Sequence, residues 1–322
     1  MASAADPGFR GFRFLPRALP ELDLSAVSTA TTFLGHRLRA PLLISCMTGG
    51  VAEAVRINQN LAVAAEASRI GLGLGSGRAL LEDPSLLPSF DVRDRAPSVP
   101  LLANLGASQL LSEHGIDGCR RLVEILRADA LVLHLNALQE ALQPEGTPRF
   151  HGLLHRVEQL CRHSQFPVIV KEVGFGIPPD DAVRLADVGV AAIDVAGAGG
   201  TSWSEVERHR LPEPSASIAA EFARWGIPTA EAIQRVREVL PALPLIGSGG
   251  IRSGVDVAVA IALGADLAGL AGPFLRAADA GEGDAAELAE RLIAVLSITM
   301  FAIGATGIGE LRGNHRLERV RA

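Results

Sequence analysis

Lys171 stands out first, because it is the only lysine among the 322 residues of the chain. It follows the apolar run PVIV, so the sequence places it at the end of a buried strand. A lysine ammonium is a compact point charge, unlike the wide planar guanidinium of the arginines that supply the other basic side chains. At this position Lys171 could form a Schiff base, pair with a carboxylate, or stabilise a flavin anion.

The segment LHLNALQEALQPEG carries a second group of reactive side chains. His134 and Asn136 share one face of the predicted strand, because alternate residues of a strand point to the same side. Glu140 is a single carboxylate, and magnesium is often held by one carboxylate together with substrate phosphates and water. The pattern favours a magnesium-bound diphosphate substrate, although a solvent-facing glutamate at the start of a helix would look the same. Gln139 is the fourth polar residue of this group.

Two glycine turns indicate a phosphate site. Residues 244–252 read PLIGSGGIR, and a helical pattern follows at 253–263. Glycine lets a backbone approach an anion closely, and the N–H groups at a helix start carry partial positive charge. A second strand, 267–271, runs into Gly272 and Pro273 in the same way. Two such consecutive units are typical of the phosphate site of a (β/α)8 barrel, whereas one Gly-Ser-Gly-Gly loop alone could be a tight turn.

Further polar residues stand where other apolar runs end. Asn104 follows LLA, and its amide could hydrogen-bond a planar heterocycle, although a lone asparagine there is more often a turn former. In a barrel enzyme the active site lies at the C-terminal ends of the strands. The other candidates at such positions are Thr48, Ser76, Arg78, Glu172, Thr201, Ser202 and Arg252.

The elements that must position these residues form a repeating pattern of short apolar runs, most of them followed by a helical pattern. Continuous apolar strands that alternate with helices indicate a parallel sheet covered by helices. Eight units in roughly 270 residues predict an α/β fold with one closed (β/α)8 TIM barrel, and a doubly wound sheet is the alternative. We expect an N-terminal extension at 1–40, the barrel at 41–310 and a C-terminal tail at 311–322. The predicted strands are 41–47, 70–75, 100–106, 130–136, 167–173, 191–196, 244–247 and 267–271, and predicted helices include 55–68, 118–126, 153–163, 180–187 and 231–240.

Composition limits the possible functions. Apolar residues make up 48% of the chain, enough for a sizeable core, and the net charge of −6 argues against non-specific nucleic-acid binding. The three cysteines are odd in number and show no metal-ligand spacing. They therefore indicate buried thiols of a reducing compartment, and neither disulfides nor a zinc site. The longest uncharged run, 292–309, contains glycines and is shorter than the roughly 20 residues of a membrane span. We therefore expect a buried helix there and a cytoplasmic protein without a membrane or nucleic-acid partner.

Several stretches together carry a resemblance to a known family. HLNALQEALQPEG, KEVGFG and AGAGGTSW are its most specific motifs, and GSGGIR is shared by many FMN-binding barrels. ALPELD, FLGHRLRAPLLISCMTGG, ANLGASQ and GADLAGLAGPFL accompany them in the same order. On these motifs the chain resembles the type 2 isopentenyl diphosphate delta-isomerases, which are FMN-dependent barrel enzymes.

The resemblance implies isomerisation of isopentenyl diphosphate to dimethylallyl diphosphate with reduced FMN and Mg²⁺. It also implies NADPH as the reductant and a homo-tetramer or homo-octamer. By the same resemblance, Gln139, His134 and Asn136 are catalytic and substrate-binding residues, and Glu140 is the magnesium ligand. The implied FMN-binding residues are Met47, Thr48, Gly49, Ser76, Asn104, Lys171, Thr201, Gly250, Ile251, Arg252, Ala271 and Gly272.

The sequence departs from the family in the residues that would hold the diphosphate. An N-terminal Arg-Lys pair usual in the family has no counterpart, so Arg78, His134, Arg10 and Arg13 are the candidate cations. Two alternatives stay open. One is an FMN-dependent 2-hydroxy-acid oxidoreductase, whose active site uses tyrosines that this chain lacks. The other is a flavin-binding barrel without isomerase turnover.

Overall fold

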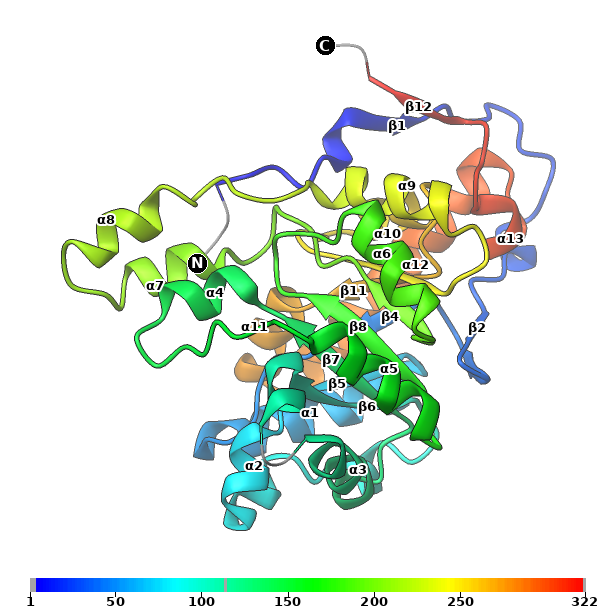
Figure 1. Ribbon diagram of the computed structural model, residues 1–322. Coiled ribbons are helices and arrows are strands. Elements are labelled where there is room, and N and C mark those ends of the chain that lie inside the picture. Colours follow the sequence, from blue (N-terminus) through cyan, green and yellow to red (C-terminus); the bar gives the residue numbers. More distant parts are fainter. Residues whose placement is uncertain (1–3, 113–114, 321–322) are drawn as a thin grey trace.

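The computed structural model describes residues 4–112 and 115–320, and its centre is a closed barrel of eight parallel strands (Figure 1). Each strand pairs with the next along the chain, and β11 pairs back with β4. Closure confirms the predicted (β/α)8 barrel and rules out an open doubly wound sheet. The strands are β4 (Leu42–Ile44), β5 (Gly71–Ser76), β6 (Leu101–Gly106), β7 (Ala130–Leu135), β8 (Val168–Glu172), β9 (Ala192–Asp194), β10 (Leu245–Ser248) and β11 (Leu267–Leu270).

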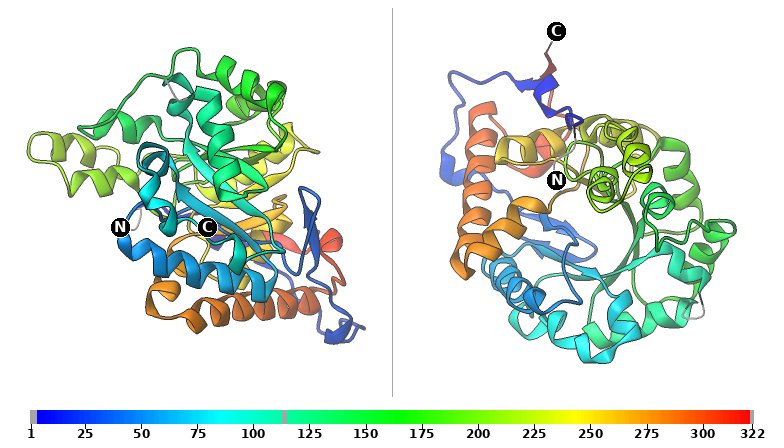
Figure 2. Two further views of the ribbon diagram at one scale, coloured as in Figure 1. Left: turned by 90° about the horizontal axis from the view of Figure 1, so that it is seen from below. Right: turned by 90° about the vertical axis from the view of Figure 1, so that its left-hand side faces the viewer.

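Helices surround the barrel, as the view along its axis shows (Figure 2, right). They cover it because each buries one apolar stripe; in α3, for example, Cys119, Leu122 and Leu126 are buried. The outer helices are α1 (Ala52–Ser68), α3 (Gly115–Leu126), α5 (Leu153–His163), α6 (Pro179–Asp187), α9 (Thr229–Val239), α10 (Gly254–Ala262), α11 (Gly272–Ala280) and α12 (Glu282–Ile303). Shorter helices are α2 (Arg78–Glu82), α4 (Ala137–Leu142), α7 (Trp203–Arg208), α8 (Ser215–Ala220) and α13 (Ile308–Leu311).

A hairpin from the N-terminal extension packs into the barrel interior. It consists of β2 (Thr31–Phe33) and β3 (His36–Leu38), whose side chains Phe33 and Leu38 join the inward-facing residues of the barrel in one buried cluster. In Figure 1 the hairpin lies at the end of the barrel opposite α7 and α8. It therefore covers the end that carries the N-termini of the strands and leaves the other end for chemistry.

The long apolar run near the C-terminus forms a helix with different limits from those predicted. Instead of 292–309, α12 spans Glu282–Ile303. It ends at Gly304, which has a left-handed φ of 75° and closes the last turn by donating to Phe301 O. The predicted start was wrong because the helix begins before the uncharged run. Its exposed face carries charged residues such as Glu290 and Arg291, while its opposite face is buried.

Both ends of the described chain are tied to each other. Strand β1 (Phe12–Phe14) pairs antiparallel with β12 (Leu317–Arg319), and Arg13 lies 3.6 Å from the carboxylate of Glu318. Arg13 is thus occupied in this pair rather than at the barrel mouth. Among residues 4–112 and 115–320, no helix has both the length and the apolar character needed to cross a membrane.

The hairpin predicts a specific stability effect. Phe33 is 3% exposed inside the barrel, so Phe33→Ala should lower the free energy of unfolding by about 3–5 kcal/mol. Chemical denaturation followed by circular dichroism would measure the change. Leu19→Ala is the control, because Leu19 is 72% exposed and its loss should have little effect. Equal destabilisation by the two changes would contradict this role of the hairpin.

Candidate active site

Four adjacent strands bring three predicted residues and Asp194 into one row at the C-terminal end of the barrel. The pairing register places His134 of β7 beside Lys171 of β8, and Lys171 beside Asp194 of β9. On the other side, the ring nitrogen Nδ1 of His134 lies 2.9 Å from Oδ1 of Asn104 on β6. The row thus joins residues far apart in the sequence, from Asn104 to Asp194, because the strands are parallel and in register.

Lys171 is 9% exposed, and its ammonium donates a hydrogen bond of 2.5 Å to the backbone oxygen of Glu172. Its charge acts on the groups around it. Burial disfavours the imidazolium form of His134, and the nearby charge of Lys171 disfavours it further. The two effects together lower the pKa of His134 to about 3. His134 is consequently neutral near pH 7, and one of its two ring nitrogens can accept a hydrogen bond.

Asp194 balances this positive charge from the neighbouring strand. It is 3% exposed, and its Oδ1 accepts hydrogen bonds from Ser248 Oγ at 2.7 Å and from the Ala196 amide at 3.1 Å. Burial raises the pKa of Asp194, while the charge of Lys171 and the hydrogen bonds from Ser248 and Ala196 oppose the rise. Burial also raises the pKa of the Cys46 thiol to about 12, which leaves it uncharged beside the row.

The carboxylate of Glu172 fixes the loop after β8. Its Oε2 accepts hydrogen bonds from the backbone amides of Val173, Gly174 and Phe175 at 2.6, 2.8 and 2.5 Å. Burial raises the pKa of Glu172 to about 7, against the three amides and the Lys171 charge, which favour the carboxylate. The role of Glu172 in this structure is therefore to shape the loop next to Lys171.

The residues after β7 form a polar cluster of their own. Asn136 Nδ2 donates to Glu140 Oε1 at 2.9 Å and to Gln139 Oε1 at 3.3 Å. Glu140 Oε2 accepts from the Thr147 amide at 2.6 Å, so the following loop folds back over it. Asn136 Oδ1 is buried and accepts no hydrogen bond from any described residue. A free amide oxygen beside a carboxylate is a donor set that fits a hard cation such as Mg²⁺.

The described residues contain no cluster of three or more His, Cys, Asp or Glu side chains that could hold a metal ion by themselves. A magnesium ion at Glu140 would need additional oxygen ligands from substrate phosphates and water. Such shared coordination is usual for this ion, which keeps several waters and rarely sits in an all-protein cage.

The two glycine turns lie where the sequence placed them, after β10 and β11. Gly249 and Gly250 have left-handed φ angles of 108° and 74°. A Cβ at Gly249 would lie 2.2 Å from Gly197 O, and one at Gly250 would lie 2.6 Å from Gly199 O. Only glycine permits this contact between the two loops, and the resulting bare backbone fits a phosphate group of the kind FMN carries.

The polar groups around the glycine loops hold them in place. Thr229 Oγ1 donates to Gly249 O at 2.6 Å, and Arg252 Nη2 donates to Gly199 O at 3.0 Å. Ala271 precedes α11, whose first residues are Gly272 and Pro273. Ile251 is buried behind the loop, so its backbone rather than its side chain could face a ligand.

The remaining predicted residues lie at the same end of the barrel but have other partners. Ser76 pairs in register with Asn104, and Thr48 Oγ1 donates to Asn58 Oδ1 at 2.6 Å. Arg78 is exposed on α2 and forms an ion pair of 2.9 Å with Glu82. Met47, Gly49 and Thr201 lie in the loops after β4 and β9, and the Thr201 residue is exposed.

Comparison with known proteins agrees with this geometry. The profile of the FMN-dependent dehydrogenase family matches residues 135–318. An isopentenyl-diphosphate delta-isomerase of Nostoc is 48% identical over 98% of this chain and 90% of its own length. The enzyme of that name from Xanthobacter autotrophicus is 51% identical over 97% of this chain and 91% of its own length. The chain belongs to the isopentenyl-diphosphate delta-isomerase family.

A solved structure of a flavocytochrome b2 variant with bound pyruvate is similar in fold. Its TM-score is 0.71 at 19% identity, over 97% of this chain and 77% of its own length. At this identity the likeness shows a common barrel and nothing about the substrate.

Two buried carboxylates in this family member were missed by sequence reasoning. Asp194 ends the apolar run AAID, so its strand-end position was the signal that could have revealed it. The side chain of Glu207 on α7 is fully buried; it accepts from Gln139 Nε2 at 3.2 Å and pairs with Arg210 at 3.2 Å. No sequence signal marks Glu207, because SEVER reads as a solvated helix.

The His134 environment gives a prediction that nuclear magnetic resonance can test. We expect the imidazole of His134 to stay neutral down to about pH 3, and Lys171→Met to raise its pKa by removing the neighbouring charge. Nitrogen chemical shifts of labelled histidine would report both values. The unfolded chain binds this proton near pH 6.5, so His134 penalises folding increasingly as the pH falls from about 6.5 to about 3. His315, which is exposed, is the internal control; a His134 pKa unchanged in the variant would contradict the assignment.

Proposed function

We propose that this protein isomerises isopentenyl diphosphate to dimethylallyl diphosphate with reduced FMN and Mg²⁺. The first support comes from relatives with that enzyme name, which match nearly the whole chain. The observation that supports it most directly is the row of Asn104, His134, Lys171 and Asp194 at the same end of the barrel as the glycine loops and the Glu140 cluster. A cofactor phosphate at the glycine loops and a substrate diphosphate near Glu140 could thus be held at one mouth of the barrel.

The isomerisation moves a double bond, so the substrate gains a proton at its terminal carbon and loses one from C2, with no net oxidation. When bound, reduced FMN would supply the proton chemistry next to the double bond. The protein's own contribution would be placement and electrostatics. Lys171 would set a fixed positive charge near the flavin, and Asn104 would offer an amide to its ring edge.

The substrate side of the site has its own assignments. Neutral His134 and Asn136 would contact the diphosphate, and Gln139 would lie beside the substrate with its orientation fixed by the buried Glu207. Glu140 and the free oxygen of Asn136 would hold Mg²⁺ together with the phosphates. Arg78 would need to exchange its surface ion pair with Glu82 for the diphosphate.

NADPH as the physiological reductant and a homo-tetramer or homo-octamer complete the proposal. The 2-hydroxy-acid oxidoreductase remains the alternative, and the solved structures of similar fold include such oxidases. Anaerobic assays would decide, with reduced holoprotein for turnover of isopentenyl diphosphate and oxidised holoprotein for flavin reduction by the hydroxy acids. We expect isopentenyl diphosphate to be converted and (S)-lactate or (S)-mandelate not to reduce the flavin; the reverse pattern would overturn the assignment.

Lys171 provides the test for the cofactor. Lys171→Met should weaken FMN binding about tenfold to a hundredfold, because a charge-assisted contact contributes about 1.5–3 kcal/mol. Flavin fluorescence titration of the apoprotein would measure it. Arg121→Met is the control, since Arg121 is an exposed cation on α3. Normal flavin affinity together with normal turnover in Lys171→Met would remove Lys171 from the site.

Glu140 provides the test for the metal. Glu140→Gln removes a charge but keeps the side-chain size, so the Mg²⁺ concentration for half-maximal activity should rise by about tenfold or more. FMN content should stay unchanged, because Glu140 lies in the polar cluster after β7 and not at the glycine loops. Glu124→Gln, an exposed glutamate on α3, is the control. An identical magnesium titration in wild type and Glu140→Gln would place the ion elsewhere.

A further inference from the structure

Two loops at the mouth of the barrel are joined by a chain of polar side chains. The chain begins at Glu145, in the loop after α4, and passes through Arg210, which follows α7. Arg210 Nη2 donates to Glu145 Oε1 at 3.0 Å, and its Nη1 donates to Oε2 of the buried Glu207 at 3.2 Å. The chain ends where Gln139 Nε2 donates to Glu207 Oε1 at 3.2 Å. The function assigned so far uses neither Glu145 nor Arg210.

The carboxylate of Glu207 depends on these partners because of where α7 places it. The buried residues of this helix are both polar, Ser204 and Glu207. Ser204 Oγ donates to Phe222 O at 3.0 Å, so the backbone satisfies that hydroxyl. The side chain of Glu207 is fully buried, and an ionised carboxylate there is costly unless a cation lies beside it. Among the residues that the structure describes, Arg210 is the only cation that pairs with Glu207.

Arg210 also acts on the loop that carries Glu140. Glu145 lies two positions before Thr147, whose amide donates to Glu140 Oε2 at 2.6 Å. The turn between them is tight, because a Cβ on Gly146 would lie 2.0 Å from Glu140 O. By holding Glu145, Arg210 therefore ties this turn, and with it the partner of the Glu140 carboxylate, to the end of α7.

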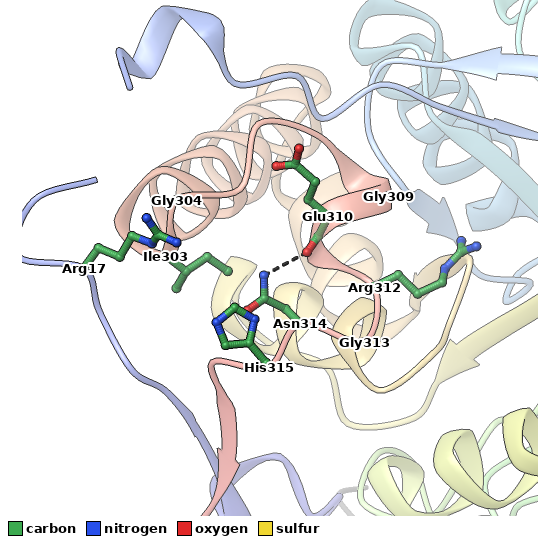
Figure 3. Close-up of a pocket in the computed structure, with 9 residues that line it drawn as sticks. All are labelled: Arg17, Ile303, Gly304, Gly309, Glu310, Arg312, Gly313, Asn314 and His315. Carbon is green, nitrogen blue, oxygen red and sulfur yellow. Dashed lines mark hydrogen bonds between the residues drawn. The ribbon is translucent and has the colours of Figure 1, made fainter. Parts of the chain in front are cut away.

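An ion pair at the other end of the barrel serves as a comparison. Arg312 lines a cavity of about 360 Å³ near the C-terminal end of α12 (Figure 3). Its Nη2 donates to Asp266, which directly precedes β11 and so lies where the barrel strands begin. Asp266 also pairs with Arg237 at 2.6 Å. This ion pair links two segments as Arg210 does, but far from Gln139 and Glu140, which follow the C-terminal end of β7.

We propose that Arg210 is a positioning residue for the isomerisation. It holds Glu207 in the orientation that fixes Gln139, and it holds the turn that places Glu140. This role requires no contact of Arg210 with substrate or flavin. A guanidinium suits it, because separate nitrogens of its planar fork bind the two carboxylates at once, which a compact ammonium does less well. The inference rests on the proposed function, because it assumes that Gln139 and Glu140 serve the substrate.

Steady-state kinetics of the reduced holoprotein test the effect on the reaction. We expect Arg210→Ala to lower kcat for isopentenyl diphosphate about tenfold to a hundredfold, because small displacements of positioned groups have effects of this size. FMN affinity, measured by fluorescence titration, should stay unchanged, since the partners of Arg210 belong to the loops after β7 and β9. Arg210→Lys should recover part of kcat.

Arg184→Ala is the matched control for the kinetics. Arg184 on α6 also pairs with a carboxylate three residues away, at 2.9 Å, but that carboxylate, Asp181, is half-exposed. Its loss should leave kcat unchanged. Wild-type kcat in Arg210→Ala would overturn the proposal.

Hydrogen–deuterium exchange of the holoprotein gives a readout that needs no turnover. The amides of the turn at 143–147 should exchange about twofold to fivefold faster in Arg210→Ala and in Glu145→Gln, the size expected for loss of an exposed ion pair. Glu145 is exposed, so its substitution tests the link without disturbing the fold. Arg312→Ala should lower the Tm but change neither kcat nor this exchange.

The outcomes separate this inference from the proposed function. An equal fall of kcat in Arg312→Ala and Arg210→Ala would show a general effect of stability and overturn the positioning role. Wild-type exchange at 143–147 in both Arg210→Ala and Glu145→Gln would also overturn it, while the isomerase assignment would stand. Faster exchange in both variants of a protein that does not turn over isopentenyl diphosphate would support the link between the loops and reject the proposed reaction instead.

Discussion

The buried positive charge of Lys171 is the interaction on which the mouth of the barrel depends. An ammonium that is 9% exposed must be compensated by nearby dipoles and charges, since an isolated charge in a protein interior is costly. In this structure the backbone oxygen of Glu172 accepts a hydrogen bond from the ammonium, and Asp194 lies beside Lys171 on the next strand. The same charge helps to keep His134 neutral. Burial is the larger cause of the pKa shifts of His134 and Asp194, and the charge of Lys171 is the next, so one lysine acts on the charge state of several groups around it.

Close backbone contact is the second constraint, and it applies at the loops after β9 and β10, next to the strand of Lys171. The loops after β9 and β10 touch through Gly199 and Gly250, and Pro7 of the N-terminal segment packs against both. The backbone oxygen of Pro7 also accepts from the Ala230 amide at the start of α9. The N-terminal extension therefore stabilises the barrel at two places, with Pro7 at the glycine loops and Phe33 inside the far end.

The charges at the mouth are divided between its two sides. Arg252 and the starts of α10 and α11 lie at the loops after β10 and β11, whereas Glu140 and Glu207 follow β7 and β9. Such a division would let one anion bind directly to the protein and another bind through a cation, as the proposed reaction requires. It also explains how a chain with a net charge of −6 could accept two phosphorylated ligands.

The sequence by itself determined the barrel and part of the site. All eight strands follow from apolar runs, and Lys171, Asn104 and the glycine turns follow from their places at strand ends, because those signals are local. The tertiary structure alone decided which distant residues meet. Gln139 and Glu207 are 68 residues apart, and Gly199 meets Gly250 only because the loops after β9 and β10 lie side by side. How the barrel closes decides that a glutamate in SEVER is buried and that Lys171 pairs with Asp194 on the next strand. Closure is a property of all the strands together, so no single segment of the sequence reveals it.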